Sequence, residues 1–167
     1  SCMEFRPSGI LVVSRRSLGG IGDHVPENRV ECWDISGGRI HCSETDHPLS
    51  SMTPTQSGVI VGDVMGGVTQ VEISGQLSGR IQLDDQRIST LSCSDEIICA
   101  GIWFNIIGLR DECILWKCEL DGIPRSITRL SDGRSIAVCV NPSTGAVSAW
   151  VFNPQGDVED EDDVESQ

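Results

Sequence analysis

Alternating apolar and polar residues dominate the chain. Between Val71 and Leu83, every second residue is apolar or glycine, and the residues between them are polar. A period of two residues is typical of a β-strand with one buried face and one solvated face. Gly75 and Gly79 fall on the apolar phase, where glycine marks a bulge or a bend. We therefore predict one long, bent strand over Val71–Leu83.

Short apolar runs separated by turn residues recur along the rest of the chain, and helical periodicity is nearly absent. This pattern predicts an all-β protein: an antiparallel β-sandwich or jelly-roll barrel of about eight strands. We expect a long loop over His41–Ser57, and no repeat of fixed period, which disfavours a propeller. A hairpin is expected to join the last two strands. The other predicted strands are Ile10–Val13, Val30–Ile35, Gly58–Val64, Ile97–Ile107, Cys113–Leu120, Ser135–Val140 and Ala146–Phe152.

Charge divides the chain into two parts. The net charge of −13, from 12 basic and 25 acidic residues, argues against a DNA-binding domain of the usual basic kind. Seven acids and no base lie between Asp157 and Gln167. We therefore predict one β-sandwich domain with a short N-terminal arm over residues 1–156 and an acidic, solvated C-terminal tail over 157–167. Neither a transmembrane helix nor a signal peptide is expected.

The eight cysteines lie largely in apolar runs, which favours reduced, packed thiols over disulfides. Four residues, Cys32, His41, Cys42 and His47, are of the types that bind zinc. Their spacing is wrong, because the adjacent His41 and Cys42 would point to opposite faces of a strand. We therefore expect no metal site and no cofactor.

Catalytic motifs are absent from the sequence. His24 follows Asp23, so a triad can be drawn, but no nucleophile-bearing motif accompanies it. The glycine-rich run Leu18–Gly22 lacks the lysine and the helix of a phosphate loop. Paired acids such as Asp84 and Asp85 fall at predicted turns. We expect the protein not to be an enzyme.

Aromatic residues supply the candidate functional positions. Trp103, Trp116, Trp150 and Phe152 all fall in predicted strands, where packing in the core or between subunits is the expected role. Stacking against a carbohydrate is the alternative role for these rings.

The two ends of the sequence suggest processing. The chain begins with Ser1 and ends with Gln167, the residues that a glutamine-specific viral protease leaves at Gln/Ser junctions. With the strand-rich pattern and the mass of 18.0 kDa, these ends resemble the single jelly-roll coat proteins of picorna-like viruses, especially the small coat proteins of plant secovirids. The strand over Val71–Leu83, the run Ile97–Ile107 and the hairpin over Ser135–Phe152 look like central strands of such a roll.

This resemblance implies a capsid subunit, released from a polyprotein, that assembles with sister coat proteins into an icosahedral virion. Its expected partners are other coat subunits, with a weak contact to viral RNA or to a host receptor, and no membrane. Its expected location is the virion, and the host cytoplasm during assembly. The alternative is a viral spike or a receptor- or glycan-binding β-sandwich module.

Overall fold

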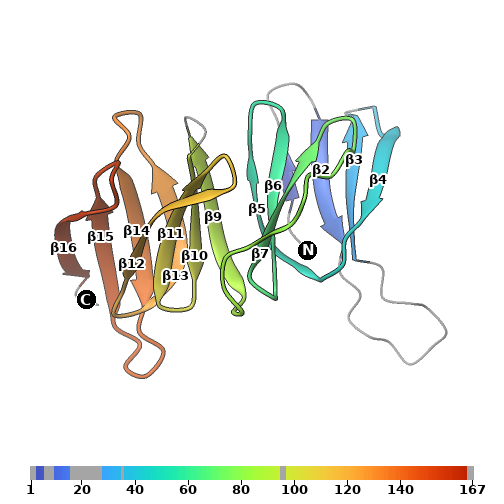
Figure 1. Cartoon of the computed structure of the whole chain (residues 1–167). Helices are drawn as coiled ribbons and strands as arrows, with labels where there is room; N and C mark the ends of the chain where they lie inside the picture. Colours follow the sequence, from blue (N-terminus) through green and yellow to red (C-terminus); the bar gives the residue numbers. More distant parts are fainter. Residues whose placement is uncertain (1–2, 6–9, 16–27, 35, 95–96, 165–167) are drawn as a thin grey trace. The chain divides into compact units, whose positions relative to one another are not determined.

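The computed structural model describes residues 3–5, 10–15, 28–34, 36–94 and 97–164, and all of their regular structure is β (Figure 1). The described residues form sixteen strands in four antiparallel sheets and contain no helix, so the predicted all-β class is confirmed. It follows that no helix in this part of the chain is long and apolar enough to cross a membrane. The strands are β1 (Met3–Phe5), β2 (Ile10–Arg15), β3 (Arg29–Asp34), β4 (Arg39–Glu44), β5 (Leu49–Pro54), β6 (Gly58–Asp63), β7 (Gly67–Glu72), β8 (Ile81–Gln82), β9 (Ile88–Ser94), β10 (Ile97–Ile102), β11 (Asn105–Arg110), β12 (Cys113–Glu119), β13 (Ile123–Arg129), β14 (Ser135–Val140), β15 (Val147–Phe152) and β16 (Val158–Val164).

Each sheet consists of four consecutive strands, paired in chain order. This up-and-down form is that of a β-propeller blade. A jelly roll pairs strands that are distant in sequence, so the predicted eight-strand sandwich or jelly roll is corrected to four consecutive blade-like sheets. The four sheets nevertheless repeat one form, although not at a fixed period. The sheets begin at Met3, Leu49, Ile88 and Ile123, and this unequal spacing conceals them from a search for a fixed period.

The chain divides into two units, residues 1–85 and residues 86–167, with two sheets in each. Each unit buries apolar side chains between its own two sheets. Unit 1 clusters Val30, Cys32, Leu49, Val59, Val61 and Val71. Unit 2 clusters Ile97, Cys99, Ile106, Leu120, Ile127, Ala137, Cys139 and Phe152. The single domain that we expected over residues 1–156 stays a prediction beside this division into compact units.

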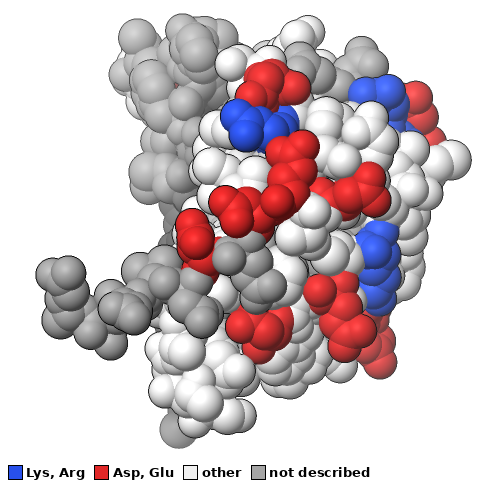
Figure 2. All heavy atoms as spheres, turned by 90° about the vertical axis from the view of Figure 1, so that its left-hand side faces the viewer, with Lys and Arg blue, Asp and Glu red and all other residues white. Residues whose placement is uncertain are grey.

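The acidic segment after Asp157 is a strand for most of its length. Strand β16 pairs with β15 along residues 158–164, with Asp160 opposite Val151 and Asp162 opposite Ala149. An outermost strand satisfies its backbone on one side only and can leave charged side chains in water. For residues 158–164 the predicted separate tail is therefore corrected, because acidic composition did not prevent strand pairing, and residues 165–167 lie outside the described part of the chain. Figure 2 shows this side of the molecule, where acidic side chains gather.

The strand predictions were best in unit 2. Strand β14 spans the predicted residues, β15 begins one residue late, and the two pair as the expected hairpin, from Ser135 opposite Phe152 to Val140 opposite Val147. The predicted strand over Ile97–Ile107 is instead the hairpin of β10 and β11. It turns at Trp103 and Phe104, and Trp103 has a φ of +49°.

Two predictions in unit 1 were wrong. The long strand over Val71–Leu83 ends at Glu72, and a turn closed by the N–H of Glu72 donating to the carbonyl of Gln76 (2.9 Å) precedes the short β8. The predicted loop over His41–Ser57 contains the end of β4 and all of β5. Both errors concern segments whose structure depends on contacts with the rest of the sheet.

Candidate functional site

A cavity of about 130 Å³ lies within unit 1. The β4–β5 connection, the end of β6 and the segment before β8 contribute to its lining. Leu49, Val61 and Leu77 give it an apolar part, and the remaining lining residues are polar or charged. The cavity therefore combines a surface for hydrocarbon with groups that orient a charge.

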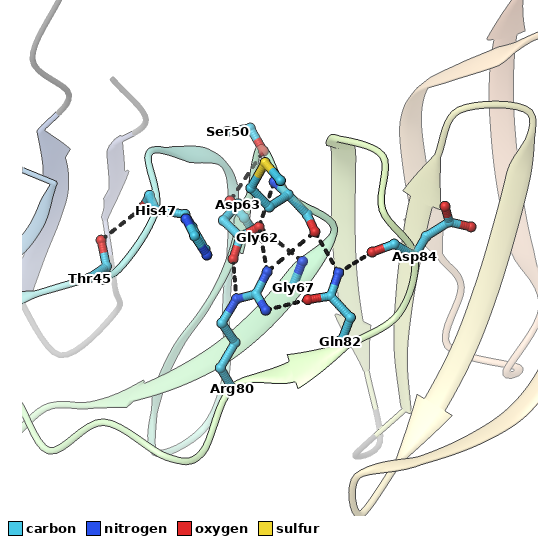
Figure 3. Close-up of polar contacts among 10 residues, drawn as sticks. Thr45, His47, Ser50, Gly62, Asp63, Gly67, Arg80, Gln82 and Asp84 are labelled. Carbon is cyan, nitrogen blue, oxygen red and sulfur yellow. Dashed lines mark hydrogen bonds and ion pairs between the residues drawn. The ribbon is translucent and has the colours of Figure 1, made fainter.

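An ion pair forms one wall of this cavity (Figure 3). The Nε of Arg80 donates to Oδ2 of Asp63 at 2.6 Å, and its Nη2 donates to Oδ1 at 3.1 Å. The Asp63 side chain is 7% exposed and that of Arg80 is 24% exposed. Nη1 of Arg80 also donates to Oε1 of Gln82. The forked geometry uses both carboxylate oxygens and fixes the guanidinium in one plane.

Backbone donors complete the surroundings of Asp63. Its Oδ1 accepts the N–H groups of Met65 at 2.8 Å and Gly67 at 3.0 Å, which closes the turn between β6 and β7. Burial raises the pKa of Asp63, but hydrogen bonds from Arg80, Gly67 and Met65 and the charge of Arg80 outweigh it. The net result is a pKa below the ordinary value, so Asp63 is an anion at neutral pH.

Glycine at position 67 makes the close approach of Arg80 possible. A Cβ at this position would overlap the guanidinium of Arg80. The backbone of β7 therefore lies directly against the cation.

Acidic residues at the end of β4 and in the β4–β5 connection form the rim of the cavity. Glu44 and Asp46 are exposed, and His47 is half-buried. The hydrogen bond to Asp63 raises the pKa of Arg80 against its burial, and the charges of Asp63 and Asp46 add to this effect. With three carboxylates and one guanidinium in the lining, the cavity has an excess of negative charge. Figure 3 shows the His47 ring beside the Asp63–Arg80 pair.

The aromatic candidates from the sequence lie in unit 2, and three of them form one stack. Phe152 is fully buried, and its ring centroid lies 6.3 Å from that of Trp116 and 6.4 Å from that of Trp150. The Nε1 of Trp150 donates to Oγ of Ser148 at 3.0 Å and to Oδ1 of Asp121 at 3.3 Å. These three rings are packing residues within the unit.

Trp103 lies elsewhere, and its expected position in a strand is corrected. It occupies the turn between β10 and β11, is 50% exposed and contacts Phe104 edge-on, with 5.1 Å between the ring centroids. Neither of the two turn residues, Trp103 and Phe104, is a glycine. The apolar run Ile97–Ile107 therefore suggested a continuous strand.

Of the zinc-type residues, the adjacent His41 and Cys42 point apart, as the strand argument indicates. His41 lies opposite Cys32 on β3, and Cys42 lies opposite Glu31, so the adjacent pair faces opposite sides of the sheet. Within the described ranges, no group of three or more His, Cys, Asp or Glu residues could hold a metal ion. His24, Asp23, the run over Leu18–Gly22 and Cys2 lie outside the described residues.

All seven cysteines in the described part of the chain are thiols rather than disulfides. Cys139 is fully buried, and burial raises its pKa to about 12, with the charges of Asp121 and Cys118 adding to the shift. Cys113, in contrast, is exposed. Because the thiolate is the nucleophile, Cys139 should react very slowly in the folded protein.

We expect brief treatment of the native protein with iodoacetamide at pH 8 to modify Cys113 and to leave Cys139 unmodified. At a pKa of about 12, only about one Cys139 side chain in ten thousand is a thiolate at pH 8. Peptide mass spectrometry of quenched samples measures both sites, and labelling in urea is the control for complete reactivity. Equal native labelling of the two cysteines would contradict this assignment.

Comparison with known proteins identifies a fold and not a family. No family model matches the chain. No curated protein matches it either. Among solved structures, it is similar to Kuenenia stuttgartiensis hydrazine synthase (TM-score 0.80, 14% identity, 97% of this chain and 48% of that chain). It is also similar to the computationally designed Ika8 protein (TM-score 0.78, 13% identity, 96% and 48%). Sqt1 of Saccharomyces cerevisiae gives a TM-score of 0.71 at 16% identity, over 91% and 44%.

These similarities extend over almost the whole chain, whereas the chain spans only about half the length of the structures that it matches. At such low identity, the shared feature is the fold alone, and the functions of those proteins do not transfer.

Proposed function

We propose that the protein is a binding module whose cavity in unit 1 takes a basic side chain of a protein partner. The observation that carries this proposal is the combination of an apolar part with an acidic rim in one cavity. The alternative expected from the sequence, a binding module, is thus preferred to the capsid subunit. The capsid expectation rested on the strand pattern, the mass and the two ends of the sequence, and sheets of consecutive strands offer no support for the jelly roll that it implied.

The size of the cavity suits a single long side chain. A volume of about 130 Å³ holds about four water molecules, which is close to the size of a lysine side chain. Methylene groups of such a side chain would lie along Leu49, Val61 and Leu77, and its ammonium would remain near Glu44 and Asp46 at the rim. The Asp63–Arg80 pair is already satisfied and serves as a fixed wall.

The expected affinity is modest and depends on salt. An exposed ion pair contributes about 0.2–1 kcal/mol, so the two rim carboxylates add selectivity for a cation more than tight binding. Salt at physiological strength screens such exposed charges over about 8–10 Å.

We expect the double variant Glu44→Gln, Asp46→Asn to bind a fluorescent, lysine-containing peptide several-fold more weakly than the unmodified chain does. Fluorescence anisotropy at low salt measures this, and the same peptide with acetylated lysine should bind no better to the unmodified chain than to the variant. The matched control is Asp111→Asn, Glu112→Gln, which makes the same change of net charge at the β11–β12 turn in unit 2. Equal loss in both double variants would attribute binding to overall charge and would refute the cavity as the site.

A further inference from the structure

The last sheet of unit 2 has an apolar face that no other strand in the described part of this unit covers. On β14 this face carries Ile136, Val138 and Val140, and on β15 it carries Val147, Ala149 and Val151. The residues pair directly across the two strands, so they form a continuous patch at the centre of the sheet. All six are only partly buried, whereas Ala137, Cys139 and Phe152, on the opposite face, are fully buried. We call this patch the outer face.

The corresponding face in unit 1 is covered by a neighbouring sheet. Strand β3 reads Val-Glu-Cys-Trp from Val30, and β15 reads Val-Ser-Ala-Trp from Val147. Each strand is the third of its sheet, and in each the tryptophan Nε1 donates to the side chain two residues before it: Trp33 to Glu31 at 3.1 Å and Trp150 to Ser148 at 3.0 Å. Strands β3 and β15 are therefore equivalent, and matching residues of the two strands face the same side of their respective sheets.

Val30 and Cys32 occupy in β3 the positions that Val147 and Ala149 occupy in β15. In unit 1 these two residues are 1% and 2% exposed, because they pack against valines of the next sheet, β5–β8. The outer face is thus built from positions that the fold buries wherever a following sheet is present.

A sheet face that no neighbouring repeat covers is normally polar, because such a face must remain soluble. The outer face has six aliphatic side chains in two adjacent central strands, so it lacks this property. Such a patch on a folded protein indicates an interaction surface.

Acidic residues border the outer face and restrict what can cover it. Asp160 and Asp162 on β16 lie opposite Val151 and Ala149, so they share the side of the sheet with the apolar patch. Two outer faces packed against each other would bring these acids from both copies to one interface, and like charges that are partly desolvated are unfavourable. A partner with an exposed cation on its outermost strand is favoured instead.

Strand β4, the outermost strand of sheet β1–β4, offers one such cation on the side away from β5–β8. Arg39 on β4 is opposite Trp33, on the side that does not carry Val30 and Cys32. Its side chain is 52% exposed and only loosely paired with Glu31, at 3.8 Å. Arg39 and the β16 acids both belong to the outermost strand of a sheet, so stacking of the two sheets would bring opposite charges together.

We propose that the outer face of sheet β13–β16 docks head to tail against sheet β1–β4 of a second copy of this chain. One copy of this chain covers 48% of the Ika8 chain and 48% of the hydrazine synthase chain. Two copies together would therefore match the length of those solved chains. Because the interface does not involve the cavity, this proposal stands or falls separately from the proposed function.

Sedimentation velocity and light scattering over a range of concentrations test the proposal. We expect a species with twice the 18.0 kDa mass of one chain at micromolar concentration. The variant Val138→Lys, which puts a charge at the centre of the outer face, should raise the dissociation constant at least about tenfold. The matched control is Leu115→Lys, since Leu115 is an equally apolar residue of β12 that is 49% exposed and lies outside the face. Circular dichroism verifies that both variants are folded.

A second variant identifies the partner surface without placing a charge in a strand centre. Arg39→Glu should also weaken the dimer, and mixing Arg39→Glu with Val138→Lys should restore it, since a head-to-tail pair keeps one intact interface. A single-chain mass at all concentrations overturns the proposal. A dimer that Val138→Lys leaves unchanged, or one that Arg39→Glu leaves unchanged, overturns it as well.

Discussion

Replacement of Phe152 by alanine is expected to lower the free energy of unfolding of unit 2 by about 3–5 kcal/mol. The ring is fully buried and lies nearly parallel to two indoles, at interplanar angles of 14° to Trp116 and 11° to Trp150. Large aromatic neighbours have few alternative rotamers, so they cannot fill the space that the phenyl ring leaves. The cost therefore includes both the lost burial of the ring and a residual cavity.

Urea denaturation followed by tryptophan fluorescence measures this change. Three of the four tryptophans belong to unit 2, so the signal reports mainly on its unfolding. Leu115→Ala is the matched control, because it also truncates an apolar side chain and retains every tryptophan, but at a residue that is 49% exposed. A Phe152→Ala midpoint no lower than that of the control would contradict the central role of the ring in this core.

The period of two residues predicts strands well where one face of the sheet is buried. In β14, Ser135, Ala137 and Cys139 are buried, and the residues between them are only partly buried, so alternation in the sequence corresponds directly to alternation in burial. The same pattern misleads over Val71–Leu83. There, a turn also contains alternating residues, and the choice between strand and turn depends on contacts such as Ser43 Oγ donating to the carbonyl of Gly75 at 2.6 Å. Such contacts are not visible in a local pattern.

The blade-like sheets have one mark in the sequence besides the alternation of apolar and polar residues. Trp33 is followed by Asp34 at the end of β3, and a tryptophan–aspartate pair at this place is a known mark of propeller blades. In the last sheet the tryptophan remains but Val151 replaces the aspartate. The signal therefore occurs once in full, which is too little to reveal a repeat.

The cavity could not be predicted, because its residues come from separate parts of unit 1. Asp63 ends a strand that is buried throughout, Arg80 precedes β8, and His47 lies in a connection that we expected to be one long loop. One indication was present: an acid at the end of the apolar run Gly58–Val64. Acids are rarely buried without a cationic partner, which would have justified a search for one.

Replacement of Arg80 by methionine is expected to destabilise unit 1 by about 2–3 kcal/mol at pH 7. The change leaves the Asp63 carboxylate, which is 7% exposed, without its cation, although the N–H groups of Met65 and Gly67 still donate to it. Loss of hydrogen bonds to a buried charge costs about this much. The matched control is Arg134→Met, which breaks a pair with Asp132 whose side chains are 45% and 49% exposed. The control should shift the unfolding midpoint far less, because an exposed pair contributes little.

The effect of Arg80→Met should disappear as the pH falls. The pKa of Asp63 is lowered from its ordinary value of 3.8 in the folded chain, so the ion pair contributes its stabilisation above that pH and loses it as the pH falls further. In the variant, burial still raises the pKa of Asp63 while the opposing effect of Arg80 is gone, so the carboxyl takes up its proton at a higher pH and is then buried as a neutral group. Urea denaturation at several pH values between 7 and 3, with hydrogen exchange of β6 and β7 peptides to localise the change, measures the difference between variant and parent. A difference that stays constant down to pH 3 would show that Arg80 stabilises unit 1 by packing alone and not by its charge.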